Sequence, residues 1–298
     1  SATLLPAGKA ILFTSRAGIG NAAILRRSAC TNQGFQSLVV NDDTDVYFVY
    51  SMTDRIKKIA EQKASGSTFL EISGKGLAAG EFAFPSKGEQ TAIGSMFKQL
   101  DHLITLHQRK YDKLCTVKKS MLDKMFPKPG ETEPEIRFEG FTDPWEQRKV
   151  SELFRVTRGY VLAATQTETT KTDEKPYPVY SSQTKDKGLM GYYKDYLYED
   201  AITWTTDGAN AGTVNYRAGK FYCTNVCGVL LSNEVKANQM IAEALNSVAK
   251  GYVSYVGNPK LMNNVMADIV IQIPTQAEER EQLSSCFAKL DNLITLHQ

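Results

Sequence analysis

The sequence lacks most of the features that mark membrane, disulfide-bonded or zinc-ribbon proteins. None of its apolar runs approaches the roughly 18 residues that a membrane helix needs. The first six residues, SATLLP, lack the charged and then apolar layout of a secretory signal peptide, so we expect a cytoplasmic protein. The five cysteines are odd in number and form no Cys-x-x-Cys pair, which argues against a zinc ribbon or a disulfide framework.

Catalytic motifs are equally scarce. The chain has no Walker phosphate loop and only three histidines, so no Ser-His-Asp set can be assembled. Residues 18–23 (GIGNAA) fit Gly-x-Gly-x-x-Ala, but Arg26-Arg27 interrupts the expected helix and no acidic residue completes a βαβ unit. Residues 258–260 (NPK) differ from the Asn-Pro-Pro-aromatic motif of adenine methyltransferases. We therefore expect a non-enzymatic chain without a bound metal or cofactor.

The bulk composition is that of a globular protein of about two domains. Hydrophobic residues make up 42% and charged residues 23% of the 298 positions, which is enough apolar material for two modest cores. The formal net charge of +2 neither supports nor excludes binding to DNA, because a basic patch can lie on a nearly neutral chain.

An internal repeat organises the chain. Residues 97–108 read FKQLDHLITLHQ and residues 287–298 read FAKLDNLITLHQ, with nine of the twelve positions identical at an offset of 190. Upstream, residues 10–15 (AILFTS) resemble residues 201–206 (AITWTT), and each is followed by a glycine-rich turn and a Cys-Thr-Asn tripeptide. The order of features is the same in both copies, which predicts a lobe followed by a helix, repeated once.

The two copies are unequal. Ser1 aligns near Tyr192, so we expect the first lobe to lack a counterpart of residues 141–191, and the second helix stops at Gln298 within the repeat. The predicted domains are a partial first lobe at 1–88, a helix at 89–126, a linker at 127–140, a second lobe at 141–277 and the start of a second helix at 278–298.

Each lobe is predicted to mix strands and helices. Alternating and β-branched residues favour strands near residues 9–15, 37–40, 201–206 and 228–231. Amphipathic helical spacing occurs at residues 45–64 and 236–249.

The long helix has the pattern of a coiled-coil seam. Its apolar residues alternate spacings of four and three, the helix would extend about 55 Å, and Pro127 and Pro129 would end it. The predicted seam positions are Ile93, Phe97, Leu100, Ile104, His107, Tyr111, Leu114, Met121 and Met125 in the first copy, and Leu283, Phe287, Leu290, Ile294 and His297 in the second. We interpret the two histidines as polar seam residues that fix register rather than as metal ligands.

A single long seam cannot bury itself, and the other copy's helix is the economical partner. We therefore predict an α+β protein in which two mixed α/β lobes are separated by long helices that form an antiparallel coiled coil.

This pattern resembles the specificity subunit of type I restriction-modification systems. The resemblance depends on the Leu-Asp-x-Leu-Ile-Thr-Leu-His-Gln repeat at 100–108 and 290–298, on residues 138–145 (FEGFTDPW), and on residues 177–182 (YPVYSS) followed by 188–192 (GLMGY). In that family two target-recognition domains alternate with two repeated helices, and the resemblance covers essentially the whole chain.

The resemblance implies a function of geometry rather than chemistry. Each lobe would read one half of a split site in double-stranded DNA, with the coiled coil as the spacer. The helices would hold two methyltransferase subunits and, through them, restriction and translocase subunits. S-adenosylmethionine, ATP and Mg would bind to those partners.

DNA contacts call for Arg, Lys, Asn, Gln and Ser on loops, because phosphate contacts position a protein and base-edge contacts specify sequence. The polar stretch at 181–188 and the residues around the glycine-rich turns fit best. The candidate DNA-binding residues are Ser15, Arg16, Arg26, Arg27, Ser181, Gln183, Thr184, Lys185, Lys187, Arg217 and Lys220.

Two other interpretations remain open at this point. The chain could be the recognition part of a fused restriction-methylation enzyme, which would require methyltransferase motifs upstream in the complete gene. It could also be a coiled-coil scaffold whose lobes bind protein, which would show no salt-dependent affinity for duplex DNA. An incomplete first lobe also suggests self-association, with a second chain completing the lobe.

Overall fold

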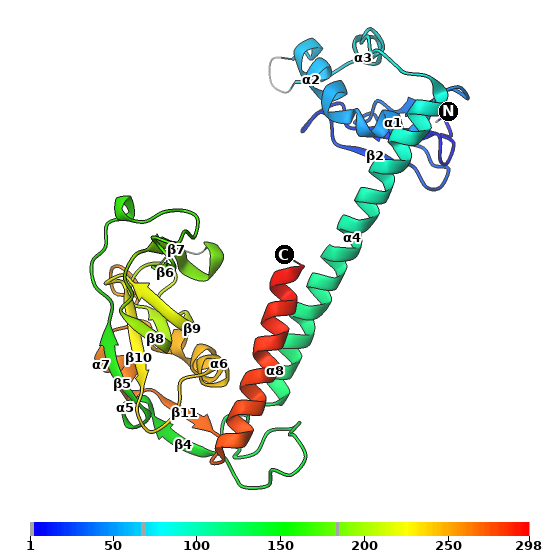
Figure 1. Cartoon of the computed structure of the whole chain (residues 1–298). Helices are drawn as coiled ribbons and strands as arrows, with labels where there is room; N and C mark the ends of the chain where they lie inside the picture. The colour runs from blue at the N-terminus through cyan, green and yellow to red at the C-terminus, as the bar shows by residue number, and fades with distance from the viewer. Residues whose placement is uncertain (1–2, 67–69, 183–184, 298) are drawn as a thin grey trace. The chain divides into compact units, whose positions relative to one another are not determined.

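The computed structural model describes residues 3–66, 70–182 and 185–297 of the chain. These residues form two compact units, Ser1–Arg109 (unit 1) and Lys110–Gln298 (unit 2), and the long helix α4 (Lys87–Lys124) crosses the boundary between them. Each unit is described by itself, with the labels of Figure 1.

Unit 1 is built on a small antiparallel sheet in the order β2-β1-β3. Ile11 of the central strand pairs with Ile24 on one side and with Leu38 on the other. The chain then continues through short helices to α4. The elements of unit 1 before α4 are β1 (Ala10–Phe13), β2 (Ala22–Ile24), β3 (Leu38–Val39), α1 (Val46–Ser51), α2 (Thr53–Lys63) and α3 (Gly74–Ala78).

The core of unit 1 lies between this sheet and the helices. Ile11 and Phe13 of β1 are fully buried against Phe48 of α1 and Ile56 of α2. The Asp45 carboxylate caps α1 by accepting hydrogen bonds from the backbone N–H groups of residues 47 and 48.

Unit 2 contains a six-stranded sheet in the order β5-β10-β8-β9-β6-β7. Neighbouring strands are antiparallel except for β6 and β9, which pair in parallel. The strands are β5 (Phe154–Arg158), β6 (Tyr177–Tyr180), β7 (Leu189–Tyr193), β8 (Tyr198–Thr205), β9 (Val214–Cys223) and β10 (Cys227–Ser232). A second sheet pairs β4 (Glu146–Lys149) with β11 (Val270–Ile273), and the helices are α5 (Val150–Leu153), α6 (Gln239–Val248), α7 (Asn263–Asp268) and α8 (Ala277–Leu296). Three 3-10 turns, η1 (Ala164–Gln166), η2 (Lys185–Gly188) and η3 (Ala249–Tyr252), complete the unit.

The alternation of side chains along β8 gives the six-stranded sheet two different faces. Ile202 and Trp204 belong to the larger core, to which α6 and α8 contribute residues as well. Ala201 belongs to a smaller apolar cluster on the other face, together with Phe221 and Val229. A Cβ atom at Gly228 would collide with the Trp204 ring, so this glycine is what allows the indole to lie flat on β10.

The two lobes share a common centre. The order β2-β1-β3 in unit 1 matches β9-β8-β10 in unit 2, and in each lobe a helix, α1 or α6, follows the third strand. Unit 2 adds β5 on one edge of this centre and the β6–β7 hairpin on the other, all within residues 154–193.

The predicted antiparallel pairing of helices is present within unit 2, where α8 lies beside the last part of α4 (Figure 1). Phe126, just after α4, contacts Phe287 near the middle of α8, with ring centres 5.7 Å apart. About two helical turns before Phe126, Lys118 of α4 contacts Asp291 further along α8. The pairing therefore runs antiparallel, and it buries the seam residues Met125, Leu283 and Phe287 while Tyr111, Leu114, Met121, Leu290 and Ile294 are half-buried.

The first half of the α4 seam behaves differently. Ile93 packs against the core of unit 1 rather than against another long helix. Phe97, Leu100 and Ile104 are exposed, with 39%, 45% and 66% of their surfaces accessible, and His107 is exposed as well. Among the described residues, α8 lies beside the later seam positions of α4, and the seam predicted at residues 93–107 stays a prediction.

Candidate nucleic-acid interface

Residues 185–188 of the predicted recognition stretch form a strained turn that leads into the edge strand β7 of the unit 2 sheet. Asp186 and Lys187 both have left-handed backbone conformations, with φ of 49° and 52°, and Gly188 follows with φ of 91°. Two consecutive non-glycine residues in this region are costly and persist only where the surroundings hold them. Gln183 and Thr184 lie outside the described residues, and only the backbone of Lys185 is described.

Arg217 of β9 holds this turn from beneath. Its Nη2 donates to the Lys187 carbonyl at 2.6 Å, and its Nε donates to Thr203 Oγ1 at 3.0 Å. The guanidinium lies 3.7 Å from the centre of the Tyr180 ring. Only 7% of Arg217 is exposed, and burial lowers the pKa of the guanidinium below its ordinary value. The side chain therefore acts on the turn, and its predicted contact with DNA stays a prediction.

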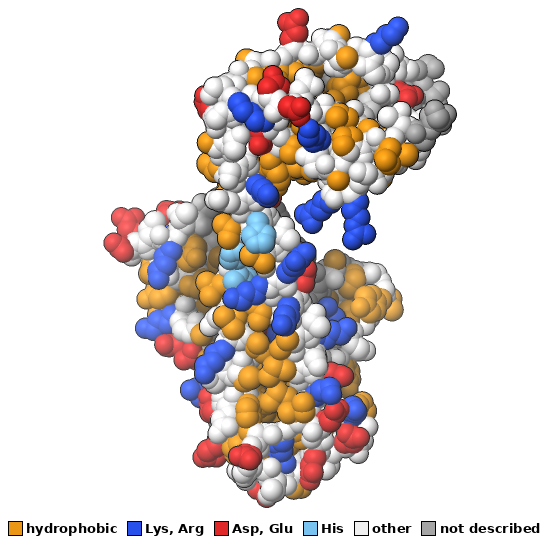
Figure 2. All heavy atoms as spheres, turned by 90° about the vertical axis from the view of Figure 1, so that its right-hand side faces the viewer, with side chains coloured by type: hydrophobic (Ala, Val, Ile, Leu, Met, Phe, Trp, Pro, Cys, Tyr) orange, Lys and Arg blue, Asp and Glu red, His pale blue; other side chains and the backbone are white. Residues whose placement is uncertain are grey.

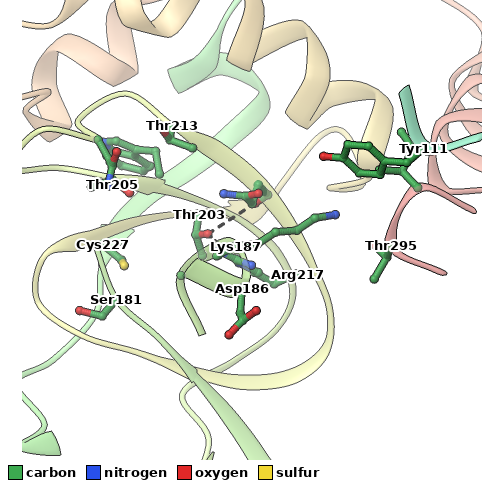
Figure 3. Close-up of a pocket in the computed structure, with 15 residues that line it drawn as sticks. Tyr111, Ser181, Asp186, Lys187, Thr203, Thr205, Thr213, Arg217, Cys227 and Thr295 are labelled. Carbon is green, nitrogen blue, oxygen red and sulfur yellow. Dashed lines mark hydrogen bonds between the residues drawn. The ribbon is translucent and has the colours of Figure 1, made fainter. Parts of the chain in front are cut away.

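A cavity of about 770 Å³ opens beside this turn (Figure 3). Most of its lining residues carry a polar group, and they come from the turn, from β8 and β9, and from the paired helices α4 and α8. The lining residues are Tyr111, Ser181, Asp186, Lys187, Gly188, Thr203, Trp204, Thr205, Asn210, Thr213, Asn215, Arg217, Cys227, Ile294 and Thr295. Hydroxyl and amide groups of this kind can donate to phosphates, and they can both donate to and accept from base edges.

Several of these cavity residues were not predicted from the sequence. Thr203 and Thr205 alternate along β8 with the core residues Ile202 and Trp204, and Thr203 pairs across the sheet with Asn215. The polar alternation at 203, 205, 213, 215 and 217 could have revealed this face, because residues two apart in a strand share a side of the sheet.

The remaining candidates lie at the surface. Lys187 is 58% exposed. The Lys220 ammonium lies 4.6 Å from the centre of the Tyr196 ring, and a hydrogen bond with Tyr196 raises the pKa of Lys220 above its ordinary value. Ser181 lines the cavity and its hydroxyl accepts a hydrogen bond from Thr224 at 3.0 Å.

In unit 1 the basic candidates are accessible, and Ser15 is not. Arg16, Arg26 and Arg27 are exposed, and Arg26 lines a hollow of about 550 Å³ together with Lys98. Ser15 is fully buried, and its hydroxyl has no hydrogen-bond partner among the described residues. The structure therefore gives no support to Ser15 as a DNA contact.

A polar cluster joins the turn at 185–188 to the helices α4, α6 and α8 of unit 2. The Lys118 ammonium of α4 lies 2.6 Å from Glu243 of α6 and 2.6 Å from Asp291 of α8. Burial by itself would lower the pKa of Lys118, but the hydrogen bonds to Asp291 and Glu243 outweigh it and raise the pKa. Gln239 Nε2 donates to Asp291 Oδ2 at 3.1 Å, and the Lys187 ammonium lies 3.7 Å from the same oxygen.

Two kinds of feature are absent from the described residues. No group of three or more His, Cys, Asp and Glu side chains is placed to hold a metal ion there. Among the described helices, none combines the length and the apolar character that crossing a bilayer requires.

Comparison with known proteins identifies the family. The family model described as the type I restriction modification DNA specificity domain matches residues 1–115 and 142–298, which is most of the chain. The chain belongs to this family. The resemblance seen in the repeat and the lead-in segments is thereby confirmed.

Curated type I specificity subunits match parts of the chain. A putative type I specificity subunit N-terminus from Mycoplasma pneumoniae is 37% identical over 131 residues, which cover 43% of this chain and 68% of that protein. The type I restriction enzyme MpnII specificity subunit of the same organism is 32% identical over 159 residues, covering 51% of this chain and 47% of that protein. The chain thus spans about half to two-thirds of the length of these relatives.

Solved structures match the fold of the type I specificity family. The crystal structure of a type I restriction-modification S subunit from M. genitalium aligns with a TM-score of 0.81 and 15% identity, covering 99% of this chain and 79% of that one. This match confirms the α+β fold with two sheet-containing lobes and a long helix. At this identity it speaks for the fold alone.

Proposed function

We propose that this chain is the non-catalytic, sequence-specific DNA-recognition subunit of a type I restriction-modification complex. Each lobe reads one half of a bipartite site, and the paired long helices set the distance between the halves. Family membership gives the coarser statement, that this is a DNA specificity domain.

The duplication inside the chain is the observation that carries the proposal. Two lobes with the same central strand order are each joined to a copy of the same helix repeat. Two similar readers on related spacer helices suit a site made of two short halves with a fixed gap, because half-site spacing follows from the geometry of the protein.

The lobe of unit 2 carries side chains of the kinds that bind DNA. The strained turn at 185–188 presents Lys187 beside the cavity (Figure 3). Lys220 of β9 is exposed as well. Lysine side chains would neutralise phosphates, while hydroxyl and amide groups of the cavity would face base edges.

The helix repeat also supplies two equivalent docking grooves for methyltransferase subunits. One groove includes Ser95, Gln99 and Leu103, and the other includes the repeat counterparts Ser285, Lys289 and Leu293. Figure 2 shows hydrophobic side chains lying open between Lys and Arg on the helix face. Because the positions correspond at the repeat offset of 190, we propose that each groove receives one of two identical methyltransferase subunits.

The chemistry belongs to the partners in this proposal. Methyltransferase subunits would bind S-adenosylmethionine, and restriction subunits attached through them would use ATP and Mg. The role of this chain is to place those activities on one DNA sequence.

The test is to co-express this chain with the methyltransferase encoded beside it and to map methylated adenines by long-read sequencing. We expect a motif of two short halves separated by a fixed gap. Exchange of residues 181–188 for the stretch of another family member should change one half and leave the other half and the gap unchanged. Methylation that keeps both halves after this exchange would contradict the assignment of the turn.

The alternative functions predict different outcomes. A protein-binding scaffold would show no affinity for duplex DNA that falls with salt, whereas phosphate contacts impose such a dependence. Self-association through the first lobe predicts a symmetric motif and a dimeric mass in solution, and a monomeric mass at working concentration would contradict it.

A further inference from the structure

The aspartate of the helix repeat makes a comparable contact in both units. Asp101 and Asp291 occupy the same position of the Leu-Asp-x-Leu-Ile-Thr-Leu-His-Gln sequence. In each copy the aspartate projects from the long helix toward the first turn of the helix that follows the central strands of its own lobe.

In unit 1, Asp101 holds α1. The Tyr47 hydroxyl donates to Asp101 Oδ2 at 2.6 Å, and burial followed by this hydrogen bond raises the pKa of Tyr47 to about 12. Tyr47 lies in the first turn of α1, next to the Asp45 cap. Nearby, Gln90 of α4 accepts a hydrogen bond from the Asp45 N–H at 3.1 Å. The same helix therefore contacts the start of α1 through two residues, Gln90 and Asp101.

In unit 2, Asp291 holds α6 and the recognition turn together. Its Oδ2 accepts from Gln239 in the first turn of α6 and faces the Lys187 ammonium of the turn. Its Oδ1 lies against Lys118 of α4. Asp291 is 16% exposed, so water screens these contacts only in part. As in unit 1, a second level of contact exists, because Ser284 of α8 accepts from the Gln239 N–H at 3.1 Å.

The shared geometry suggests a task beyond helix pairing, in which Asp291 also takes part through Lys118. An aspartate at a seam-flanking position is not required for a coiled coil, which asks for apolar residues at its core positions. Its partners differ in the two units, a tyrosine in one and a glutamine with two lysines in the other, yet the contact is made at the same place of the lobe.

We infer that Asp101 and Asp291 are positioning residues that fix the orientation of each recognition lobe on its spacer helix. In unit 2 the inference extends to the turn itself, since Lys187 links the turn to Asp291 while Arg217 holds its backbone. This inference rests on the proposed function, in which the spacer sets the gap between two half-sites. A lobe whose orientation on its helix is not fixed would bind sites with a longer or shorter gap between the half-sites, while still recognising the same bases in each half.

The experiment measures gap discrimination separately from base discrimination. The chain, in complex with its methyltransferase subunits, is bound to duplexes that carry both mapped half-sites with the natural gap, with one base pair more and with one fewer. A parallel set keeps the natural gap and changes one base in each half. The variants are Asp101→Asn, Tyr47→Phe and Asp291→Asn, and the controls are Thr91→Ala and Asn292→Ala, at exposed positions of α4 and α8 outside the proposed docking grooves.

We expect the three anchor variants to lose about tenfold in gap discrimination, equivalent to about 1.4 kcal/mol, with base discrimination unchanged. The controls should match the wild type. Equal gap discrimination in variants and wild type would overturn the inference, and so would a parallel loss of gap and base discrimination, which indicates a damaged lobe. Tyr47→Phe removes a single hydroxyl and keeps the test sound if an aspartate variant folds poorly.

Failure of the proposed function gives a different result. If the wild type binds no bipartite site, the specificity role is lost while the anchors can still be judged by amide hydrogen exchange. Exchange should then speed up in α1 for Asp101→Asn and in the turn at 185–188 for Asp291→Asn. Unchanged exchange in both segments would overturn the anchor role independently of DNA.

Discussion

The two lobes have the same three-stranded centre and differ in how completely it is enclosed. In unit 1 the strands have four, three and two residues, and one apolar cluster lies against them. In unit 2 the corresponding strands have eight, ten and six residues, and both faces of the sheet are covered by apolar clusters. The added strands β5, β6 and β7 account for the extra support, because they extend the sheet on both edges.

The two copies of the helix repeat show the same contrast. Phe287 is fully buried against Phe126, whereas its counterpart Phe97 is 39% exposed. Nearly identical residues therefore reach different burial in the two copies. The comparison teaches that the repeat supplies a pattern of side chains, while the neighbouring segments decide which of them are packed.

The largest effect is expected at Glu279 and its counterpart Glu89. Glu279 is 1% exposed, and Arg137 donates to its two oxygens at 2.8 and 2.9 Å. Glu89 is exposed at the start of α4. Glu279→Ala should destabilise unit 2 by about 3 kcal/mol, because it leaves the Arg137 charge without its partner. Glu89→Ala should change stability by no more than about 0.5 kcal/mol.

Tryptophan fluorescence during urea unfolding measures the first of these effects. Both tryptophans, Trp145 and Trp204, lie in unit 2, so their emission follows that unit alone. Glu278→Ala, at an exposed neighbouring position, is the matched control. Similar losses for Glu278 and Glu279 would contradict the importance of the Arg137 pair.

A smaller effect is expected where each lobe helix begins against its repeat helix. Gly94 of α4 and Ser284 of α8 occupy equivalent positions. A Cβ atom at Gly94 would collide with the Asp45 carboxylate and lie 2.9 Å from the Phe48 nitrogen, so Gly94→Ser should destabilise unit 1 by about 1–3 kcal/mol. Ser284→Ala removes the acceptor of the Gln239 N–H and should cost about 1 kcal/mol in unit 2.

Amide hydrogen exchange distinguishes these two substitutions. Gly94→Ser should speed exchange in α1 and leave α6 unchanged, while Ser284→Ala should do the reverse. Faster exchange throughout both helices in either variant would show that the two junctions are not independent. Gly88→Ser is the control for the first, because a Cβ atom there meets open space.

The periodicity of apolar residues predicted the long helix and missed the short strands β5, β6 and β7. The long helix was predicted at residues 89–126 and is observed as Lys87–Lys124, because a seven-residue apolar pattern repeated over many turns is a strong helix signal. The strands β6 and β7 were not predicted, since four or five residues that include Pro178 or Gly191 carry little alternation. β5 was not predicted either, because five residues are a short run for a strand pattern. Their places depend on pairing with β10 and β9, which are distant in sequence.

The candidate site was predictable by residue type and not by burial. Lys187 and Lys220 were expected at a basic surface and lie there, while Arg217 and Ser15 were expected with them and are buried. Sequence spacing indicates which side of a strand a residue faces, but it does not indicate whether a turn from another part of the chain covers that side. The Lys187 carbonyl covers Arg217 in this way.

The smallest expected effect concerns two cysteines, Cys223 at the end of β9 and Cys30 after the equivalent strand β2. Cys30 of unit 1 is exposed, whereas Cys223 of unit 2 is buried beside Cys227. Burial raises the pKa of Cys223 far above its ordinary range and that of Cys227 from 9.0 to about 11. Because the thiolate is the reactive form, iodoacetamide at neutral pH should label Cys30 in the native protein and spare Cys223 and Cys227.

The same groups predict how the stability of unit 2 depends on pH. A thiol whose pKa is raised by folding favours the neutral folded form, so its contribution is complete below 9.0 and is lost as the pH rises toward about 11 for Cys227. Labelling in increasing urea, repeated at rising pH and analysed by peptide mass spectrometry, checks both the selective labelling and the pH dependence. Cys223 and Cys227 should become reactive only as unit 2 unfolds. Labelling of Cys223 as fast as Cys30 in the native protein would mean that the more enclosed lobe opens as readily as the smaller one.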